Sequence, residues 1–387
     1  MKKTGKKIIL AAIIAGMASA ALLTGCTAPS GTVSQQGGTE SSGTVSQSGF
    51  NEESSLPSFE SSEVNTDEST YGEESTEDST ETPTDSGKIN VPADYVPSSQ
   101  DDFEYIEYNN TTNTSKGRLN IHGVQITRYT GSDTDVKIPV KITEGGVEYD
   151  VVDISDQAFS GNTTIKSVTV PNISLERRQT ALVGLFSRCS SLEKAVLYIP
   201  YIPRAMFYGC TSLKEVELLN TNEEGFVDNN AFSGCTSLKE IVFSNHITNV
   251  NTEAFKGCTS LEKAEFSGGV EYVTGFAECT ALKGFEFKDT KEIRVGAFRD
   301  CTGLTEITVP ETVEAIDSEA FYNCTNLTKF TVEGKDTELK SRCAGVYFSG
   351  TSDRAPVDGF VLYTAGKLSK AHAYAVEYGL TTMTIEN

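Results

Sequence analysis

Histidine and basic residues are scarce in this sequence of 387 residues. Its three histidines, His122, His246 and His372, stand in no H-E-x-x-H motif and near no G-x-S-x-G motif, so no base is placed beside a nucleophile. The 32 Lys and Arg residues are outnumbered by 54 Asp and Glu residues, and the net charge of −22 argues against a nucleic acid partner. The sequence also lacks a glycine-rich loop that would cradle a phosphate. We therefore expect a non-enzyme with no catalytic residues, no metal ion and no other cofactor.

The N-terminal segment up to Cys26 has the composition of a targeting segment. Four lysines within residues 2–7 precede an apolar stretch from Ile8 to Leu23, which is short for a membrane-spanning helix. The stretch ends in Leu23-Thr24-Gly25-Cys26, which resembles the lipobox of bacterial lipoproteins. The resemblance implies cleavage before Cys26 and acylation of this residue, and two or three acyl chains hold a protein stably on a membrane. An ordinary secretory signal with a chance cysteine is the alternative.

Residues 26–100 are expected to form a disordered acidic tether. Between Thr27 and Lys88, two in every five positions are Ser or Thr, and acidic side chains supply nearly all the charge. So few large apolar groups cannot offset the entropy of ordering the chain. A flexible coil of this length has a root-mean-square span of roughly 40–47 Å. Such a segment would carry a folded domain away from a membrane.

The rest of the chain is an array of repeats with a period near 23 residues. A Phe marks each unit, a Cys follows three residues later in all units but the first, and a Leu or Ile follows three residues after that. The next residues alternate apolar and polar, as in Ile307-Thr-Val309, which is the period of a half-buried strand. This spacing is the signature of a solenoid, in which equivalent side chains stack into internal ladders. The ladder Phe residues are Phe159, Phe186, Phe207, Phe232, Phe255, Phe276, Phe298 and Phe321.

The corner of each unit, such as Asn251–Ser260, is expected to form a compact helical turn. Gly or Asn precedes several of the repeat cysteines and tolerates a left-handed backbone. The cysteines themselves are odd in number, lie a full repeat apart and form no C-x-x-C pair, so we predict a ladder of buried thiols. Disulfides, a metal site or a catalytic thiol are the alternatives, and Cys343 lies outside the register. The repeat cysteines are Cys189, Cys210, Cys235, Cys258, Cys279, Cys301 and Cys324.

The repeated pattern I-x-x-x-A-F-x-x-C-x-x-L-x-x-I-x-[VF] resembles the BspA-like (Treponema pallidum type) leucine-rich repeats of bacterial surface proteins. The resemblance covers roughly residues 119–387, including a first repeat at Gln125–Pro139 and a closing strand and helix near residues 363–379. It implies a β-rich α/β fold, a leucine-rich-repeat solenoid of about eight units of roughly 21–27 residues. Each unit is expected to contain one parallel strand and a short helical turn.

Both ends of such an array need caps, because an open edge invites aggregation. Residues Phe103–Tyr108 are predicted to form an N-terminal capping strand. Near the other end, the closing helix is expected to cover the last turn with one face, made of Leu368, Ala371, Ala375 and Tyr378.

We therefore divide the chain into five segments. The array lies in residues 151–332, and Phe348–Thr351 is a candidate degenerate ninth unit in the segment that follows. The segments are a lipoprotein signal peptide (1–25), the tether (26–100), the N-terminal cap with the start of the first repeat (101–150), the repeats (151–332) and the degenerate repeat with the C-terminal cap (333–387).

The second and fourth residues after each repeat Leu are expected to face solvent and form two exposed ladders. The first ladder consists of Ser167, Lys194, Glu215, Glu240, Lys263, Gly284, Glu306 and Lys329. The second consists of Thr169, Val196, Glu217, Val242, Glu265, Glu286, Thr308 and Thr331. Their middle is rich in Glu, which favours a basic protein patch or a cation. The candidate ligand-binding residues are Glu215, Glu217, Glu240, Lys263, Glu265, Glu286 and Glu306, and the alternative is that these charges only keep the sheet soluble.

A second candidate surface is the apolar and aromatic segment Tyr198–Pro203 in a repeat connection, which in the bland interpretation simply packs. Taken together, the patterns predict an exported monomer, lipid-anchored through Cys26 and exposed at the cell surface. The family resemblance implies a protein-binding or adhesion module toward host or neighbouring-cell ligands, either proteins or glycans. A structural envelope spacer without a specific ligand and an enzyme using a repeat Cys are the alternatives.

Overall fold

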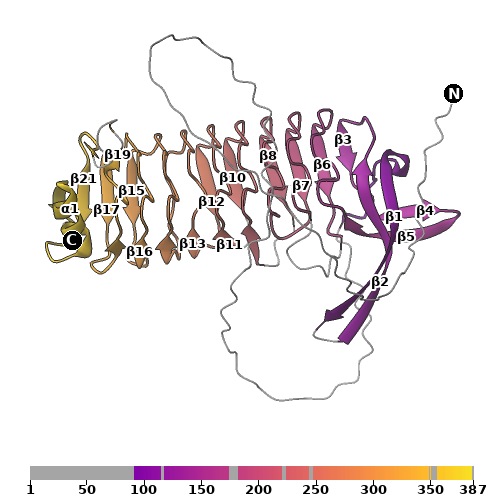
Figure 1. The fold of residues 1–387 in the computed structure, drawn as a ribbon, viewed down its shortest axis with the longest axis horizontal. Helices are drawn as coiled ribbons and strands as arrows, with labels where there is room; N and C mark the ends of the chain where they lie inside the picture. The colour runs from indigo at the N-terminus through magenta and orange to yellow at the C-terminus, as the bar shows by residue number, and fades with distance from the viewer. Residues whose placement is uncertain are drawn as a thin grey trace, which may run out of the picture. The chain divides into compact units, whose positions relative to one another are not determined.

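The computed structural model describes residues 91–114, 117–173, 182–219, 224–243, 247–347, 349 and 355–385. The predicted signal peptide, Cys26, nearly all of the tether and Phe348 lie outside these residues. Within them the chain forms a β-solenoid of about ten turns with a repeat of about 23 residues, which confirms the predicted leucine-rich-repeat architecture (Figure 1). The caps add turns to the eight units that the Phe spacing marks.

The strands that follow the repeat Leu or Ile positions, which we call the front strands, form parallel sheets along one side of the array. Along these strands buried and exposed residues alternate, as the period of two predicts. The front strands fall into three sheets. They are β3 (Asp135–Lys137), β6 (Ser167–Val170), β7 (Lys194–Leu197) and β8 (Glu215–Leu218), then β10 (Glu240–Phe243) and β12 (Lys263–Phe266), then β15 (Glu306–Val309), β17 (Lys329–Val332), β21 (Val361–Thr364) and β22 (Thr381–Thr384).

The expected strand after Leu282 is absent from the front side, which separates β12 from β15. This unit carries Gly284 and two aromatic side chains, Phe285 and Phe287, where other units have smaller or single aromatic groups. Phe285 contacts the ladder rings Phe276 and Phe298, each with ring centroids 5.2 Å away. Packing these extra rings against the core displaces the backbone from strand geometry, and Gly284 adds no strand propensity.

A second parallel sheet of six strands runs along the array, and the sequence analysis did not anticipate it. We call its members the back strands. Each carries an inward Val, Ile or Leu that precedes the ladder position of the same turn, such as Val250 and Ile293, both essentially inaccessible. The back strands are β9 (Gly225–Val227), β11 (Ile247–Val250), β13 (Tyr272–Val273), β14 (Glu292–Ile293), β16 (Ala315–Ile316) and β18 (Glu338–Leu339).

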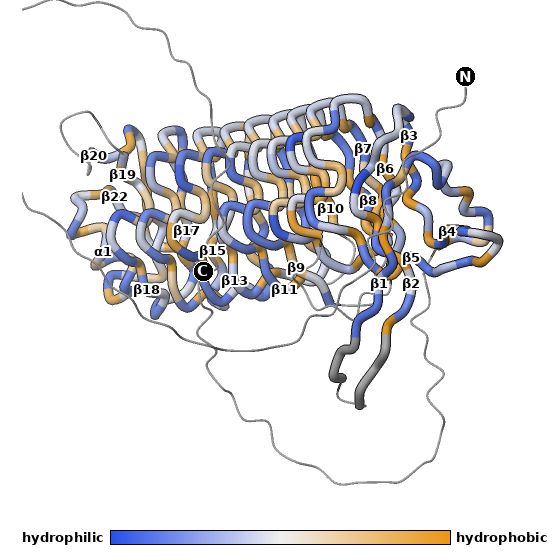
Figure 2. The backbone as a smooth tube through the Cα atoms, turned by 45° about the vertical axis from the view of Figure 1, so that its right-hand side comes forward, coloured by the Kyte–Doolittle hydropathy of each residue, from blue (hydrophilic) through white to orange (hydrophobic). Residues whose placement is uncertain are grey.

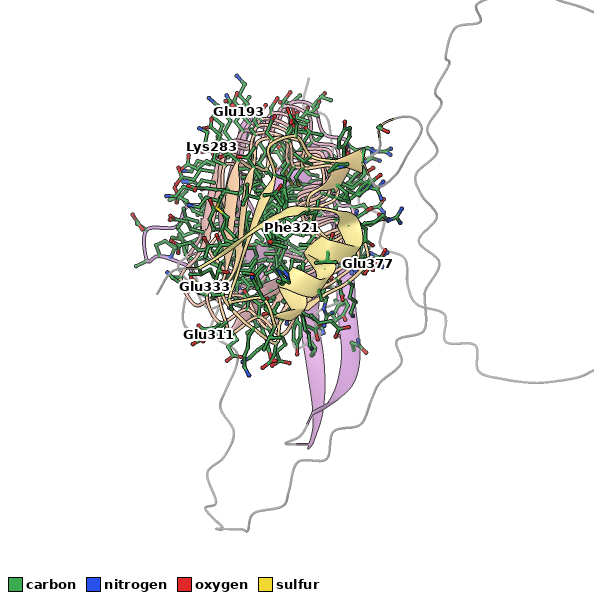
Figure 3. All side chains as sticks on the ribbon, turned by 90° about the vertical axis from the view of Figure 1, so that its left-hand side faces the viewer. Glu193, Lys283, Glu311, Phe321, Glu333 and Glu377 are labelled. Atoms are coloured by element: carbon green, nitrogen blue, oxygen red, sulfur yellow. The ribbon has the colours of Figure 1, made fainter. Side chains whose placement is uncertain are left out.

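The core between the front and back strands is a continuous stack of Phe rings. From Phe159 to Phe321, the ring centroids of successive ladder residues lie 4.9–5.8 Å apart. Hydrophobic positions align from turn to turn (Figure 2). Viewed along the array, Phe321 lies at the centre of its turn, whereas Glu193 and Lys283 lie at the periphery (Figure 3). One repeat alone would have no such core, because each ring is buried by its neighbours.

The corners beside the Phe ladder have left-handed backbone conformations. Gly209, Gly234 and Gly257, each directly before a repeat Cys, have φ between 69° and 76°, and Asn323 has φ 61°. This confirms the expectation that Gly or Asn serves a left-handed position there. The corners are turns and not regular helices. The predicted short helical turn of each unit is therefore present only as a turn.

The N-terminal cap is a sheet in the order β1-β2-β5-β4. The predicted capping strand is present as β1, which is longer than expected and pairs antiparallel with β2. Phe103 and Tyr129 extend the aromatic stack to Phe159, and Ser98, just before the 3-10 helix η1 (Gln100–Asp102), covers the edge of β3 by donating its N–H to the Lys137 carbonyl at 2.9 Å. The strands are β1 (Phe103–Thr114), β2 (Gly117–Tyr129), β4 (Lys141–Glu144) and β5 (Val147–Ile154).

At the other end, helix α1 (Lys370–Tyr378) buries Ala371, Tyr374 and Ala375 against the last turn. The Phe321 N–H donates to the Cys343 carbonyl, just as the Phe298 N–H donates to the Ala320 carbonyl, so Ala344 occupies the next ladder position. Ala344 has no ring, and the buried Tyr374 of α1 holds this position through its hydroxyl, which donates to the Ala344 carbonyl at 2.7 Å and accepts the Ala344 N–H at 3.1 Å. A two-stranded antiparallel pair, β19 (Val346–Tyr347) and β20 (Ala355–Pro356), follows this position.

The predicted covering face of the C-terminal helix is correct for three of its four residues. Ala371 and Ala375 are buried, and Tyr378 is half-buried with its hydroxyl accepting the Arg342 N–H. The prediction for Leu368 was wrong, because this residue lies before the helix and is fully exposed. The helix begins after Ser369, whose side chain caps it by accepting the N–H of His372.

Candidate binding surfaces

The front strands place the predicted exposed ladders in register. Lys194 lies opposite Glu215, Glu240 opposite Lys263, and Glu306 opposite Lys329. In the second ladder, Val196 lies opposite Glu217 and Val242 opposite Glu265. The predicted positions after the repeat Leu therefore do form common rows on the solvent side of the front strands.

Ion pairs between and within turns occupy the carboxylates of this face. The Lys194 ammonium lies 2.8 Å from Glu215 and 2.6 Å from Glu217, and it holds the pKa of Glu215 below its usual value. Lys263 lies 2.8 Å from Glu265 and 3.3 Å from Glu240. Hydrogen bonds to these two carboxylates raise the pKa of Lys263. The two remaining candidates are also paired, Glu286 with Lys288 and Glu306 with Lys329, both at 3.3 Å.

The front face therefore keeps an excess of negative charge, with six glutamates against three lysines in the two rows, but each of these carboxylates is paired with a lysine. The structure brings Glu215 and Glu217 together around one lysine, and Glu240 and Glu265 around another, with Lys263 at the centre of the second group. Exposed ion pairs of this kind contribute only about 0–1 kcal/mol each to stability. Exchange of a lysine for a cationic group of a ligand would consequently have a small energetic cost.

The Tyr198–Pro203 segment packs for the most part into the array. Ile199, Pro200, Ile202 and Pro203 are buried, whereas Tyr198 and Tyr201 are half-buried. The ring of Tyr201 stacks on that of Phe226 in the next turn, with centroids 5.1 Å apart and planes 9° apart. The segment thus contributes two partly accessible rings rather than an apolar patch.

The back strands carry an exposed ladder that the sequence analysis missed. It joins residues opposite one another in successive turns and begins with aromatic groups. A signal for it is present in the sequence, because each member lies directly before the inward Ile or Val of its turn. The ladder consists of Tyr201, Phe226, Asn249, Tyr272, Glu292, Ala315 and Glu338.

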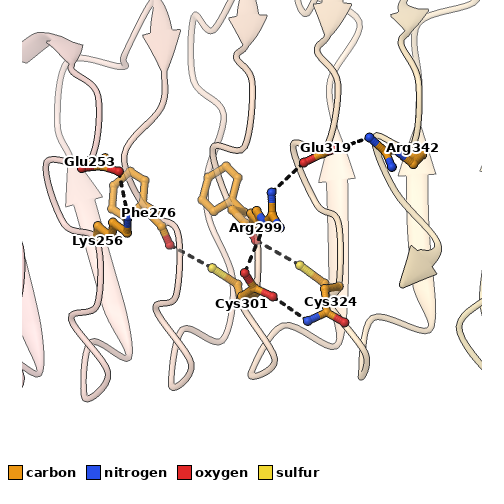
Figure 4. A network of polar contacts seen from close by, with 11 residues as sticks. Glu253, Lys256, Phe276, Arg299, Cys301, Glu319, Cys324 and Arg342 are labelled. Atoms are coloured by element: carbon orange, nitrogen blue, oxygen red, sulfur yellow. Dashed lines mark hydrogen bonds and ion pairs between the residues drawn. The ribbon is translucent and has the colours of Figure 1, made fainter. Parts of the chain in front are cut away.

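The repeat cysteines form the predicted ladder of free, buried thiols. Each Sγ lies 3.0–3.2 Å from the carbonyl oxygen of the ladder Phe in the preceding turn, as in Cys301 to Phe276 and Cys324 to Phe298 (Figure 4). That carbonyl also accepts the N–H of the Cys in its own turn, for example the Cys279 N–H to the Phe276 carbonyl. The thiol is thus both a small apolar group and a hydrogen-bond donor between turns. Cys343 is buried as well, at the ladder position that Ala320 holds in the turn before.

Burial makes these thiols poor nucleophiles. It raises the pKa of Cys189, Cys258 and Cys343 to about 12, and the pKa of the other repeat thiols is also raised. A reactive cysteine needs the opposite, a lowered pKa and access to solvent. The observed environment therefore disfavours an enzyme that uses a repeat Cys.

Iodoacetamide should leave all eight described cysteines unmodified in the native chain at pH 7, because each thiol is buried and less than about one in ten thousand is ionised. After unfolding in urea, all eight should be alkylated. Peptide mapping by mass spectrometry measures both states. Stoichiometric labelling of one repeat thiol in the folded chain would contradict the prediction and revive the enzyme alternative.

The described part of the chain contains no group of three or more His, Cys, Asp or Glu side chains arranged to hold a metal ion. None of the helices among the described residues is long and apolar enough to cross a membrane.

The stacked turns, the Phe and Cys ladders and the extended outer rows define a leucine-rich-repeat solenoid. Six copies of the family model described as the BspA type leucine rich repeat region match residues 139–224 and 225–347, more than half of the chain. The chain belongs to this family. No curated protein is significantly similar to it in sequence.

Several solved structures are similar to parts of this chain. A leucine-rich repeat protein from Bacteroides ovatus is 21% identical, with 72% of this chain and 75% of that chain covered and a TM-score of 0.46. The T. pallidum leucine rich repeat protein is 23% identical, with 74% and 98% covered and a TM-score of 0.34. A leucine rich cell surface protein from Faecalibacterium prausnitzii is 18% identical, with 59% and 95% covered and a TM-score of 0.24.

Proposed function

We propose that the chain is a lipid-anchored protein of a bacterial cell surface that acts as a monomeric protein-binding or adhesion module toward host or neighbouring-cell ligands. The observation that carries this proposal is the front face, where side chains from successive turns form solvent-facing rows along the array, interrupted at the turn after Leu282. Extended surfaces of this kind are what repeat solenoids use to bind partners. The Leu23-Thr24-Gly25-Cys26 sequence supports the anchor, and the buried, unreactive thiols speak against chemistry in the array.

The excess of carboxylates over lysines on the front face favours a ligand with basic groups. Each lysine at the centre of a group contacts two carboxylates: Lys194 those of Glu215 and Glu217 in the next turn, and Lys263 those of Glu240 in the preceding turn and Glu265 in its own strand. A partner that inserts its own cation there compensates the same carboxylates, so electrostatic complementarity would select the partner and its register. A glycan would instead use the hydroxyl and carboxylate acceptors of the same rows.

A binding screen of the purified chain against arrayed extracellular-matrix proteins, serum proteins and glycans tests the proposal. We expect saturable binding to at least one ligand, lost when Glu215, Glu240 and Glu265 are all changed to Lys. A matched control with Glu311, Glu314 and Glu338 changed to Lys makes the same charge change outside the front strands. Loss in both variants alike would indicate an effect of net charge only, and failure to bind any ligand would favour the envelope spacer.

Changing Cys26 to Ala should release the chain from the membrane fraction, because Cys26 is the proposed site of acylation. Stable attachment of the processed chain needs the two or three acyl chains that this residue would carry. Fractionation of expressing bacteria, together with mass spectrometry of the N-terminal peptide, measures the effect. Cys343→Ala serves as the control, since its thiol is buried in the array. Membrane retention of Cys26→Ala would contradict the lipid anchor.

A further inference from the structure

The exposed ladder of the back strands has an aromatic stack with one member missing. Tyr201 and Phe226 stack face to face, and the residue opposite Phe226 in the next turn is Asn249. Asn249 in turn lies opposite Tyr272, so two aromatic positions flank one asparagine. Phe226, Asn249 and Tyr272 are all half-buried and therefore partly accessible.

The spacing at Asn249 suits a flat cation. Successive strands lie about 4.8 Å apart, so the positions of Phe226 and Tyr272 are separated by roughly 9.6 Å. A group centred between them would lie about 4.8 Å from each ring, within the range of about 6 Å over which a cation is attracted to a ring face. A planar guanidinium fits between two such faces, and it stacks on aromatic rings better than an ammonium group.

The chain already places one guanidinium over the ring of Tyr272, from the turn that follows. The guanidinium of Arg294 lies over the Tyr272 ring, 4.3 Å from its centroid. Arg294 belongs to the following turn, next to strand β14. The ring of Tyr272 thus accepts one arginine from within the array, and its position faces Asn249 in the turn before.

The charges around the gap favour a cation as well. The carboxylates of Glu271 and Glu292 lie near Tyr272 against the single guanidinium of Arg294, which pairs with Glu292 at 3.4 Å, so negative charge is in excess here. The charge of Glu271, burial and a hydrogen bond to Glu271 raise the pKa of the Tyr272 hydroxyl. Glu271 is exposed and makes no ion pair with the described residues. The amide nitrogen of Asn249 donates to the Thr248 hydroxyl at 3.2 Å, which leaves the Asn249 amide oxygen as a hydrogen-bond acceptor for a ligand.

We propose that the gap at Asn249, between Phe226 and Tyr272 on the back strands, binds an arginine side chain of a partner protein. The guanidinium inserts between the two rings, donates to the Asn249 amide oxygen and is compensated by the Glu271 carboxylate. This inference rests on the proposed protein-binding function and names a contact of that function on a different face from the front rows.

The peptide acetyl-Gly-Arg-Gly-amide is the direct probe of the gap. We expect it to shift the ring resonances of Phe226 and Tyr272 saturably in NMR spectra of the purified chain. The peptide with citrulline in place of arginine keeps the shape but loses the charge, and it should bind at least tenfold more weakly. Equal shifts with both peptides, or none with either, would overturn the proposal.

Three variants distinguish binding at the gap from a general electrostatic effect. Asn249→Arg should fill the gap from within and abolish the peptide-induced shifts. Ala315→Arg adds the same charge to the same ladder, at a position between Glu292 and Glu338 with no flanking ring, and should retain them. Glu271→Gln, at an exposed position, should weaken binding at least threefold and guards against a folding defect in the first variant. Retention of the shifts in Asn249→Arg would also overturn the proposal.

The outcome is distinguishable from that of the proposed function. If the chain captures a protein ligand in the binding screen and Asn249→Arg leaves that capture unchanged, the proposed function stands and the arginine site is wrong as a partner contact. If the arginine peptide binds at the gap but no protein ligand is found, the gap does bind a guanidinium group. The proposed function then fails, and so does the inference that this group belongs to a partner protein.

Discussion

Changing Phe276 to Ala should lower the free energy of unfolding by about 3–5 kcal/mol, the usual cost of removing a buried Phe ring. Phe276 is fully buried in the middle of the array. Its ring stacks between Phe255 and Phe298, with centroids 4.9 and 5.4 Å away, and also contacts Phe285. Because each turn touches only its neighbours, the cavity weakens two interfaces at once.

Urea denaturation followed by circular dichroism measures this effect. Val295→Ala is the matched control, since Val295 lies close to the ladder in sequence but is 65% exposed, and we expect a change within about 0.5 kcal/mol. A loss below about 1 kcal/mol for Phe276→Ala would mean that the rings do not bury one another as the structure describes.

Changing Gly275 to Ala should cost about 2–6 kcal/mol, although it adds only one methyl group. Gly275 has φ +97°, a conformation that side chains rarely adopt and that costs of order 1–3 kcal/mol. A Cβ there would also lie 2.4 Å from the Asn251 carbonyl oxygen and 2.8 Å from the Ala254 nitrogen, both backbone atoms of the preceding turn. Overpacking of this kind adds typically about 1–3 kcal/mol, because the two turns must separate.

Gly257→Ala provides the control for this prediction. Gly257 also has a positive φ, +69°, but the nearest atom to its added Cβ is the Gly234 nitrogen at 4.0 Å. We expect a loss of only about 1–2 kcal/mol, the cost of a left-handed conformation without a clash. Thermal unfolding of both variants measures the difference. Equal losses of stability would show that the close approach at Gly275 does not affect the free energy of unfolding.

The interior of the array was predictable from single residues and their spacing. The Phe, Cys and Leu positions recur with one period, and each of them is buried in the structure. The alternation after the Leu residues correctly separated inward from outward side chains on the front strands. Leu368 was misplaced because a helical pattern does not specify where the helix begins, and the Ser369 cap decided that boundary.

The candidate site was predictable in position but not in its ion pairs. The rows of the front strands follow from the alternation, and Glu215, Glu240 and Glu265 lie where expected. Glu215 pairs with Lys194 and Glu240 with Lys263 because these residues of adjacent turns lie side by side, and Glu265 pairs with Lys263 of its own strand, so lysines partly compensate the expected acidic surface. The back ladder escaped notice because its strands are only two to four residues long, too short for a pattern of alternation.

The sequence by itself determined the solenoid, its repeat and the side chains that fill it, because burial of one turn on the next requires equivalent residues at a regular interval. Only the tertiary structure decided how the ends are closed and which outer groups meet. The Tyr374 hydroxyl bonds the backbone of Ala344 from 30 residues away, and Asn249 interrupts an aromatic row drawn from four different turns. Such contacts depend on the spatial alignment of turns that differ in length by several residues, and no local pattern encodes that alignment.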